Sequence, residues 1–240
     1  MNTCGFRKFQ LIKYLKIGQT SAMNFARGFK VVATAAACAV LLTGCGQSSL
    51  KYGSDTKDGV YFSVPNSWNA VTSKALSAQE ALSNTQGAAE RLSLVHFQEA
   101  YSPDPKLKAK DVLTLSAPNS PIVYARVRAL TNSEIQQVSY NDLRNLILPL
   151  TSWEDGTASS VPVYSVASDR EAVQKGGRGV HTVFSFTNNG VSQTINQTGL
   201  LSNDHRTLVM FVVRCSTVCY TKNKTVIEKA VASLTDRGSH

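Results

Sequence analysis

The chain has 240 residues, of which 42% are apolar and 17% are charged, and its formal net charge at pH 7 is +9. This length fits one domain with a leader or two small domains, with enough apolar residues for one sizeable core. All the acidic residues lie beyond residue 44, whereas basic residues occur on both sides of it. The rest of the chain is therefore only mildly basic, which argues against nucleic acid as a partner.

The segment that begins at Met23 has the order of a secretory signal peptide. Arg27 and Lys30 form a basic start, and residues 31–42 form an apolar run. The run is shorter than the roughly 20 residues that span a bilayer, but it has the length of a signal-peptide apolar region. A buried core helix is the alternative, but it would need a polar face, and Thr34 is the only polar residue of the run.

The end of this run, Leu42-Thr43-Gly44-Cys45, resembles the lipobox of bacterial lipoproteins. The resemblance implies that the Cys45 thiol carries a diacylglycerol and that a signal peptidase cuts between Gly44 and Cys45. Each buried CH₂ contributes about 0.8 kcal/mol, so two or three acyl chains anchor a protein stably. We therefore expect a lipid anchor at Cys45 that holds the protein in the cell membrane, on its extracytoplasmic face.

Residues 1–22 precede the signal peptide and leave two alternatives open. They form either an amphipathic cytoplasmic extension or an untranslated stretch ahead of the true start at Met23. We favour Met23, because residues 23–44 then make a leader of ordinary length.

The five cysteines separate into two groups. Cys4 and Cys38 leave with the leader and Cys45 takes lipid, so Cys215 and Cys219 remain as an even pair in an exported domain. Disulfides persist in such compartments, so we predict that these two residues are bonded. Two free thiols or a metal or redox role are the alternatives, but no histidine lies at zinc-ligand spacing, and we expect neither metal nor cofactor.

The predicted elements of the mature chain begin after a linker. Residues 45–58 are rich in Gly, Ser and Asp and indicate a flexible tether, so we expect one folded domain over residues 59–240. A strand starts at Val60 and ends at the turn Pro65-Asn66, and residues 69–72 are consistent with a short returning strand. Residues 73–97 have helical periodicity with a break at Gly87, although their last part fits a strand equally well.

The middle of the chain gives weaker patterns. Residues 101–110 and 152–160 indicate loops, residues 112–115 and 122–130 indicate strands, and residues 139–148 indicate a helix that Pro149 stops.

The last third of the chain is clearer. Tight turns such as Asn189-Gly190 separate four expected strands and make them antiparallel neighbours. Residues 208–213 are apolar on both faces and predict a central strand. The expected strands are 161–174, 178–187, 191–201 and 206–214, and a helix over 221–234 follows. The expected fold class is α+β, an antiparallel sheet with helices on its faces.

Two features resemble a known family. The first strand ends in Pro65-Asn66-Ser67-Trp68, and the four-strand meander is followed by a helix that closes with residues 227–234. This arrangement is similar to the PsbP-like fold and, within it, to small actinobacterial lipoproteins of the LpqN type. The resemblance implies an α/β/α sandwich used for binding or scaffolding, and it supplies no catalytic residue.

Several side chains are candidates for a site, but each has a simpler interpretation. His181 and His205 are expected at the surface, Glu154-Asp155 in a solvated turn, and residues 175–179 in a hairpin rather than a phosphate cradle. No serine lies in a G-x-S-x-G motif. The remaining candidates are Lys106, Lys108 and Lys110, expected in a solvated loop, and Trp68 and Trp153, expected in or near the core.

These observations favour a lipid-anchored, non-enzymatic binding or scaffolding module of the cell envelope, whose partner is an unidentified envelope protein or ligand. An envelope enzyme and a carrier of an apolar ligand are the alternatives. A cleft with convergent His, Asp or Glu side chains would favour the enzyme, and a purely apolar cavity would favour the carrier.

Overall fold

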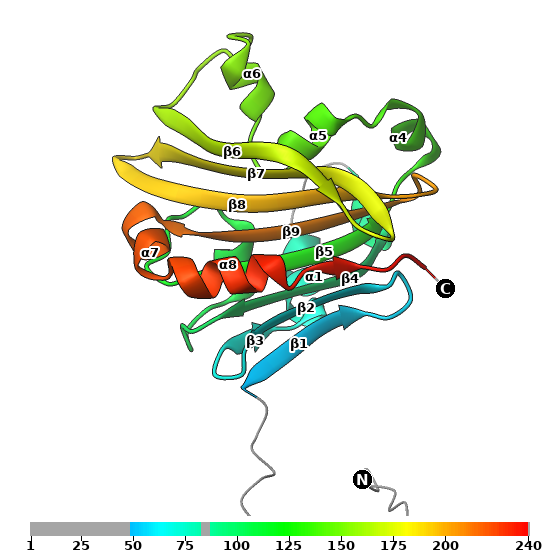
Figure 1. Cartoon of the computed structure of the whole chain (residues 1–240), viewed down its shortest axis with the longest axis horizontal. Coiled ribbons are helices and arrows are strands. Elements are labelled where there is room, and N and C mark those ends of the chain that lie inside the picture. Colours follow the sequence, from blue (N-terminus) through cyan, green and yellow to red (C-terminus); the bar gives the residue numbers. More distant parts are fainter. Residues whose placement is uncertain (1–48, 83–86, 240) are drawn as a thin grey trace, which may run out of the picture. The chain divides into compact units, whose positions relative to one another are not determined.

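The computed structural model describes residues 49–82 and 87–239, which belong to one compact unit that begins at Gln47. Its main feature is a seven-stranded sheet in which every pair of neighbours is antiparallel. In sheet order its strands are β3 (Asn69–Val71), β4 (Val95–Ser102), β5 (Ile122–Ala129), β9 (Thr207–Ser216), β8 (Val191–Ser202), β7 (Gly177–Asn188) and β6 (Tyr164–Val173). The α+β class predicted from the sequence is therefore confirmed (Figure 1).

The meander from β6 to β9 forms as its turn chemistry predicts. Asn189 and Gly190 both have positive φ, at 49° and 76°, which suits a tight hairpin between β7 and β8. β9 lies in the middle of the sheet, as expected from its apolar residues on both faces. Val209, Phe211 and Val213 point to one face, here called the front, and Leu208 and Val212 point to the other, the back.

The front face is covered by helices and by a second sheet. The helices are α7 (Thr217–Lys222) and α8 (Lys224–Ala232), and the sheet has the order β1 (Leu50–Asp55), β2 (Val60–Pro65) and β10 (Thr235–Asp236). Phe62 of β2 meets the rings of Phe97, Tyr101 and Phe211 edge-on, which closes the largest core cluster.

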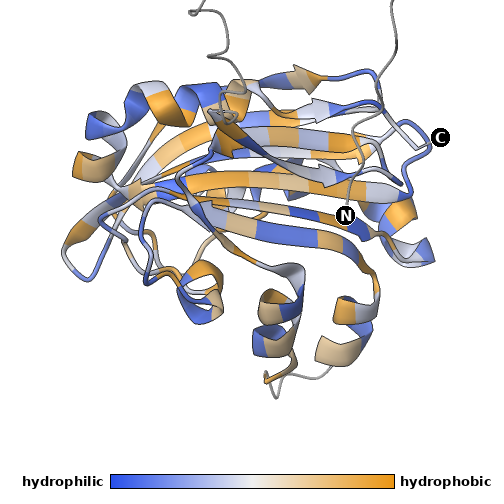
Figure 2. Ribbon diagram, turned by 90° about the horizontal axis from the view of Figure 1, so that it is seen from below, coloured by the Kyte–Doolittle hydropathy of each residue, from blue (hydrophilic) through white to orange (hydrophobic). Residues whose placement is uncertain are grey.

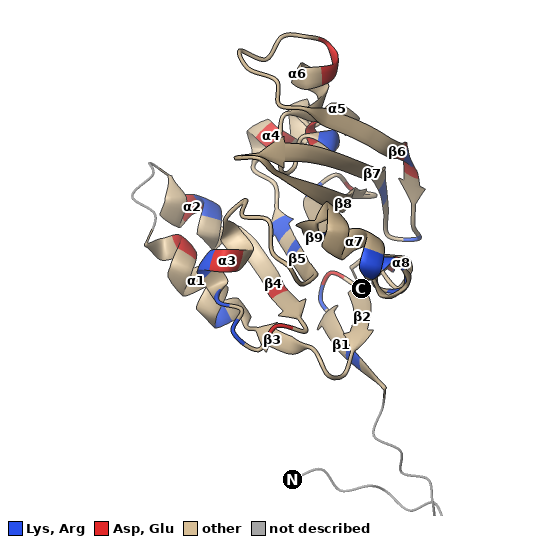
Figure 3. Ribbon diagram, turned by 90° about the vertical axis from the view of Figure 1, so that its left-hand side faces the viewer, with Lys and Arg blue, Asp and Glu red and all other residues tan. Residues whose placement is uncertain are grey.

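The back face carries six short helices in separate groups, each with its own small core. They are α1 (Ser73–Ala81), α2 (Ala88–Ser93), α3 (Ala109–Leu113), α4 (Asn132–Gln137), α5 (Tyr140–Arg144) and α6 (Leu150–Glu154). Figure 3 shows α1 to α3 on one side of the large sheet, with α7, α8, β1 and β2 on the other. In Figure 2 hydrophobic residues run along the strands, whereas the helices carry both kinds of residue.

The expected tether over residues 45–58 is wrong for residues 50–55, and the folded domain begins before residue 59. Residues 50–55 form β1, which pairs with β2 from Leu50↔Pro65 to Asp55↔Val60. Gly53 lies against the Phe62 ring, where any side chain would overlap it. A polar, glycine-containing edge strand has the composition of a linker, so its pairing with β2 was missed.

Other differences have local causes. Residues 112–115 were expected as a strand, but the chain forms α3, whose start is capped by Asp111 accepting from the Lys108 N–H at 3.0 Å. The expected helix over 221–234 is two helices that meet at Asn223, and the expected loop over 152–160 begins inside α6. α4 was not predicted, although Thr131 and Glu134 form its capping box.

Candidate functional site

The predicted lipidation site lies outside the described residues, so Gly44 and Cys45 remain predictions. In the described part of the chain, no helix has the length and apolar character to span a membrane.

Cys215 and Cys219 form a disulfide at the end of the central strand. Both are buried, and the bond links the end of strand β9 to the first turn of helix α7. Ser216 between them accepts a hydrogen bond from the Cys219 N–H at 3.2 Å and so caps α7. The disulfide therefore fixes the position from which α7 projects its next residue, Tyr220.

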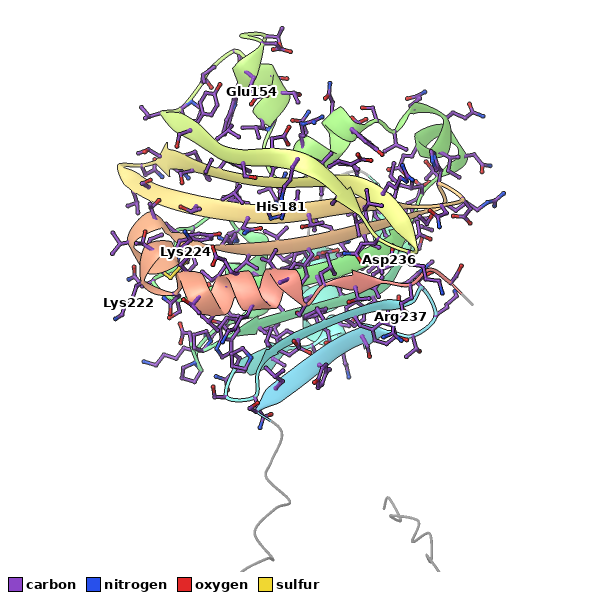
Figure 4. The ribbon with its side chains drawn as sticks, viewed as in Figure 1. Glu154, His181, Lys222, Lys224, Asp236 and Arg237 are labelled. Carbon is purple, nitrogen blue, oxygen red and sulfur yellow. A yellow bond between two sulfur atoms is a disulfide. The ribbon has the colours of Figure 1, made fainter. Side chains whose placement is uncertain are left out.

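A cleft of about 670 Å³ lies beside this helix, between the front face of β6 to β8 and the side of α8. We call it the His181 cleft. Its size is within the range of small-molecule sites. In Figure 4, His181 lies on the strands next to α8, and Lys224 lies at the first residue of that helix. Its polar lining includes Ser168, Arg170, His181, Asn196, Tyr220 and Lys224.

The floor of the His181 cleft is a chain of hydrogen bonds across four elements. Arg170 Nε of β6 donates to His181 Nδ1 of β7 at 3.2 Å, and His181 Nε2 lies 2.9 Å from Asn196 Oδ1 of β8. Asn196 Nδ2 then donates to the Tyr220 hydroxyl oxygen of α7, also at 2.9 Å. Strand pairing produces this order. Arg170 of β6 lies directly opposite His181 of β7, and β7 also pairs with β8, the strand that carries Asn196.

His181 and Asn196 are 8% and 4% exposed, so the expectation of a surface histidine at position 181 is wrong. Burial lowers the pKa of His181, and the positive charge of Arg170 lowers it further. Burial raises the pKa of Tyr220. The histidine is thus held neutral and the tyrosine keeps its proton.

The His181 cleft does not present a free catalytic base at His181. Both ring nitrogens of His181 are occupied by other side chains, so neither is poised to take a proton from a substrate. Within residues 49–82 and 87–239, no group of three or more His, Cys, Asp or Glu side chains is arranged to hold a metal ion. What the cleft offers is a set of fixed polar groups.

Of the four residues in this hydrogen-bond network, the sequence analysis identified only His181. Arg170, Asn196 and Tyr220 were missed because three elements must meet to unite them. A signal was present in β8, where Thr194, Asn196 and Thr198 place polar side chains on one face of a strand inside the sheet.

A second cleft of about 690 Å³ lies on the back face over β5 and is called the β5 cleft. Leu208 and Met210 line it together with charged residues. Its main cations are paired within the protein, Arg126 with Glu80 at 2.6 Å and Arg128 with Glu134 at 2.7 Å. The bond from Arg128 lowers the pKa of Glu134 to about 2. These ion pairs make the β5 cleft the weaker candidate for binding a charged ligand.

The other candidates have structural roles. Trp68 and Trp153 are buried in core clusters. His205 is exposed in the turn before β9 with a φ of 58°. Asp155 closes a turn by accepting from Thr157, and the three lysines are exposed. Residues 175–179 span the β6–β7 hairpin, where Gly176 packs against Asp236.

The fold and the His181 cleft together define a small α+β domain with a cleft between sheet and helix. No family model matches the chain, and no curated protein matches it. Among solved structures, it is similar to LpqN of Mycobacterium tuberculosis, described as involved in cell envelope biogenesis, at 12% identity and a TM-score of 0.43 over 78% of this chain and 91% of that chain.

It is also similar to the cyanobacterial PsbP of Synechocystis, at 13% identity and a TM-score of 0.44 over 80% of this chain and 95% of that chain. A third similar structure is the Ran-binding protein Mog1p of Saccharomyces cerevisiae, at 8% identity and a TM-score of 0.42 over 79% of this chain and 96% of that chain. Both groups suggested by the sequence are thus among these structures.

Proposed function

We propose that the protein is a lipoprotein anchored through Cys45 on the extracytoplasmic face of the cell membrane, and that its folded domain is a non-enzymatic binding module. The lipobox and the apolar run before it support the anchor. The disulfide between Cys215 and Cys219 agrees with an oxidising compartment. The partner is an envelope protein or a small ligand.

The observation that carries the binding function is the hydrogen-bonded floor of the His181 cleft. Buried polar side chains cost free energy unless they are paired, and the buried His181 and Asn196 are bonded to each other, to the exposed Arg170 and to the half-buried Tyr220. Such a network holds its members in fixed positions before any ligand arrives. A cleft of about 670 Å³ with fixed polar groups on its floor supports a binding site.

The two alternatives fit this cleft less well. An enzyme would need a free base or nucleophile, whereas the ring nitrogens of His181 are both bonded. A carrier of an apolar ligand would need a lining of apolar residues alone, whereas this cleft also has polar residues in its lining and a hydrogen-bonded floor.

Ligand retention tests the binding function. The full chain should be purified in detergent from its own cells and examined by native mass spectrometry for a bound molecule. Arg170→Ala should lose that molecule, while the exposed Arg206→Ala should retain it. A wild-type protein that carries nothing, and that crosslinks to no envelope protein in intact cells, would overturn the proposal.

The anchor has its own test. Labelled palmitate should enter the wild-type protein and should be absent from Cys45→Ala. Label in the variant would show that Cys45 is not the lipidation site.

A further inference from the structure

The hydrogen-bond chain on the floor of the His181 cleft has a direction that chemistry fixes. A guanidinium has N–H donors and no acceptor, so the bond at 3.2 Å obliges His181 Nδ1 to accept. An imidazole that accepts at Nδ1 carries its proton at Nε2. The second bond of His181, at 2.9 Å, therefore donates to Asn196 Oδ1.

The same reasoning continues to Tyr220. Because Oδ1 of Asn196 faces the histidine, its NH₂ group faces the tyrosine and donates to the hydroxyl oxygen. The Tyr220 hydroxyl oxygen thus acts as an acceptor in this hydrogen-bond network. Its own O–H proton is left to donate to another acceptor. Across residues 49–82 and 87–239, no hydrogen bond from this proton to another side chain or carbonyl is found.

Arg170 leaves donors unused at the other end. Its Nε is committed to His181, and among the described residues its two Nη groups have no hydrogen-bond partner. Arg170 is exposed on β6, so this guanidinium edge is open to the cleft. A guanidinium edge is shaped for the paired oxygens of a carboxylate or phosphate.

Besides Arg170, the charged residues of the lining are one cation, Lys224, and two carboxylates, Glu171 and Glu228. Lys224 contributes a second cation, held only loosely by Glu228 at 3.7 Å in a pair that is mostly exposed. The other carboxylate of the lining, Glu171, faces Arg178 at 3.9 Å on the rim. Exposed pairs of this kind are weak, so both cations stay available to a ligand.

We propose that the His181 cleft binds a small anion whose carboxylate or phosphate oxygens accept hydrogen bonds from the Arg170 Nη groups and the Tyr220 hydroxyl. This inference rests on the proposed binding function and specifies the chemistry of its ligand. A neutral polyhydroxyl compound fits less well, because its hydroxyls also need acceptors, and the ends of the floor chain present donors.

Calorimetry on the full chain in detergent micelles tests the proposal with inorganic phosphate and succinate as anionic probes and glucose as a neutral one. At least one anion should bind, and glucose should not. Arg170→Gln should weaken anion binding about tenfold or more, and Tyr220→Phe about threefold to tenfold, in line with charge-assisted and neutral hydrogen bonds. The exposed Arg206→Gln and Tyr140→Phe are matched controls that should leave affinity unchanged.

Lys224→Gln is a cleft variant that should fold normally, because the Lys224 side chain is 65% exposed. It should weaken anion binding by a smaller factor than Arg170→Gln. Equal affinities of wild type and all three cleft variants would overturn the proposal.

The outcomes also separate this inference from the proposed function. If a neutral molecule is recovered from the native protein and no anion binds, the proposal of an anionic ligand is wrong, while the proposed binding function still stands. A protein that binds no probe and carries no molecule would overturn both.

A lipid headgroup and a soluble anion share this chemistry, and vesicles distinguish them. Binding of the Cys45→Ala chain to phosphatidylglycerol vesicles, lost in Arg170→Gln, would identify a headgroup as the source. Phosphate or succinate binding without vesicle binding would identify a soluble anion.

Discussion

The Arg170 Nε lies 3.2 Å from the His181 Nδ1, so an exposed residue of an edge strand is bonded directly to a buried histidine. This contact keeps the histidine neutral, since a proton on Nδ1 would break the bond and face a positive charge. The stability of the domain should therefore depend on pH through His181.

The pKa of His181 in the folded protein lies below its ordinary value of 6.5, so the unfolded chain takes up a proton first as the pH falls. The free energy of unfolding should fall as the pH drops from 6.5 towards the folded pKa, by about 1 kcal/mol at most because solvent reaches the cleft. The charges that act on His181 are those of Arg170 and Asp169. The other charged residues that line the cleft are Glu171, Lys224 and Glu228.

Urea unfolding at a series of pH values from about 5 to 8 measures this dependence. His181→Gln should flatten it, whereas the exposed His205→Gln should not. Parallel curves for wild type and His181→Gln would contradict the prediction.

A second prediction concerns Arg214, which is 5% exposed on the back face of β9. Its guanidinium donates to the carbonyl oxygens of Asp111 at 2.7 Å, Val112 at 3.1 Å and Ser116 at 2.6 Å. Burial lowers its pKa to about 10, so it stays charged at neutral pH. Arg214→Met should leave these carbonyls without a donor and lower the free energy of unfolding by about 3 kcal/mol or more.

Urea denaturation at pH 7 is the measurement. Arg178→Met is the control, since the Arg178 side chain is 66% exposed and its ion pair is long, and it should change stability by less than about 0.5 kcal/mol. A loss at Arg214 no larger than that of the control would show that the segment after α3 is held by other contacts.

The third prediction concerns Asp236 of β10, whose pKa is raised by burial and by the nearby charge of Asp58. A raised carboxyl pKa gives stability that is present below the ordinary value of 3.8 and lost as the pH rises through the folded pKa. At pH 7 the charge is therefore a cost. Asp236→Asn keeps an oxygen for the Gly238 N–H and should raise the free energy of unfolding by up to about 1 kcal/mol.

Thermal unfolding at pH 4 and pH 7 tests this, and the gain should shrink at the lower pH. Asp155→Asn is the opposite case, because hydrogen bonds from Thr157 lower the Asp155 pKa, and it should bring no gain at pH 7. A destabilised Asp236→Asn at pH 7 would contradict the argument.

The parts of the fold that the sequence predicted are those decided by local chemistry. Asn189-Gly190 and the alternation on either side define β7 and β8, and the apolar residues of β9 place it centrally. β1 was missed although its partner strand follows closely in the sequence, whereas α3 depends in part on a remote residue. β1 pairs with β2 despite a linker-like composition, and the carbonyls at the end of α3 are bonded by Arg214, about a hundred residues later.

The candidate site was harder to predict for a related reason. His181 alone looks like any polar residue of a strand. Its role depends on Arg170 lying opposite it in register and on Tyr220 reaching over Asn196 from a helix. Register and helix placement follow from packing of the whole domain, so hydrophobic periodicity alone does not reveal them.

If the protein is exported as proposed, the disulfide between Cys215 and Cys219 would determine when the His181 cleft is completed. Tyr220 follows Cys219 directly, so a chain with both thiols reduced would lack the covalent tie that positions one end of the cleft. The site would then be completed only after the chain has met an oxidant. If the leader directs export, newly made protein would stay unloaded during synthesis and would begin to capture its ligand only after crossing the membrane.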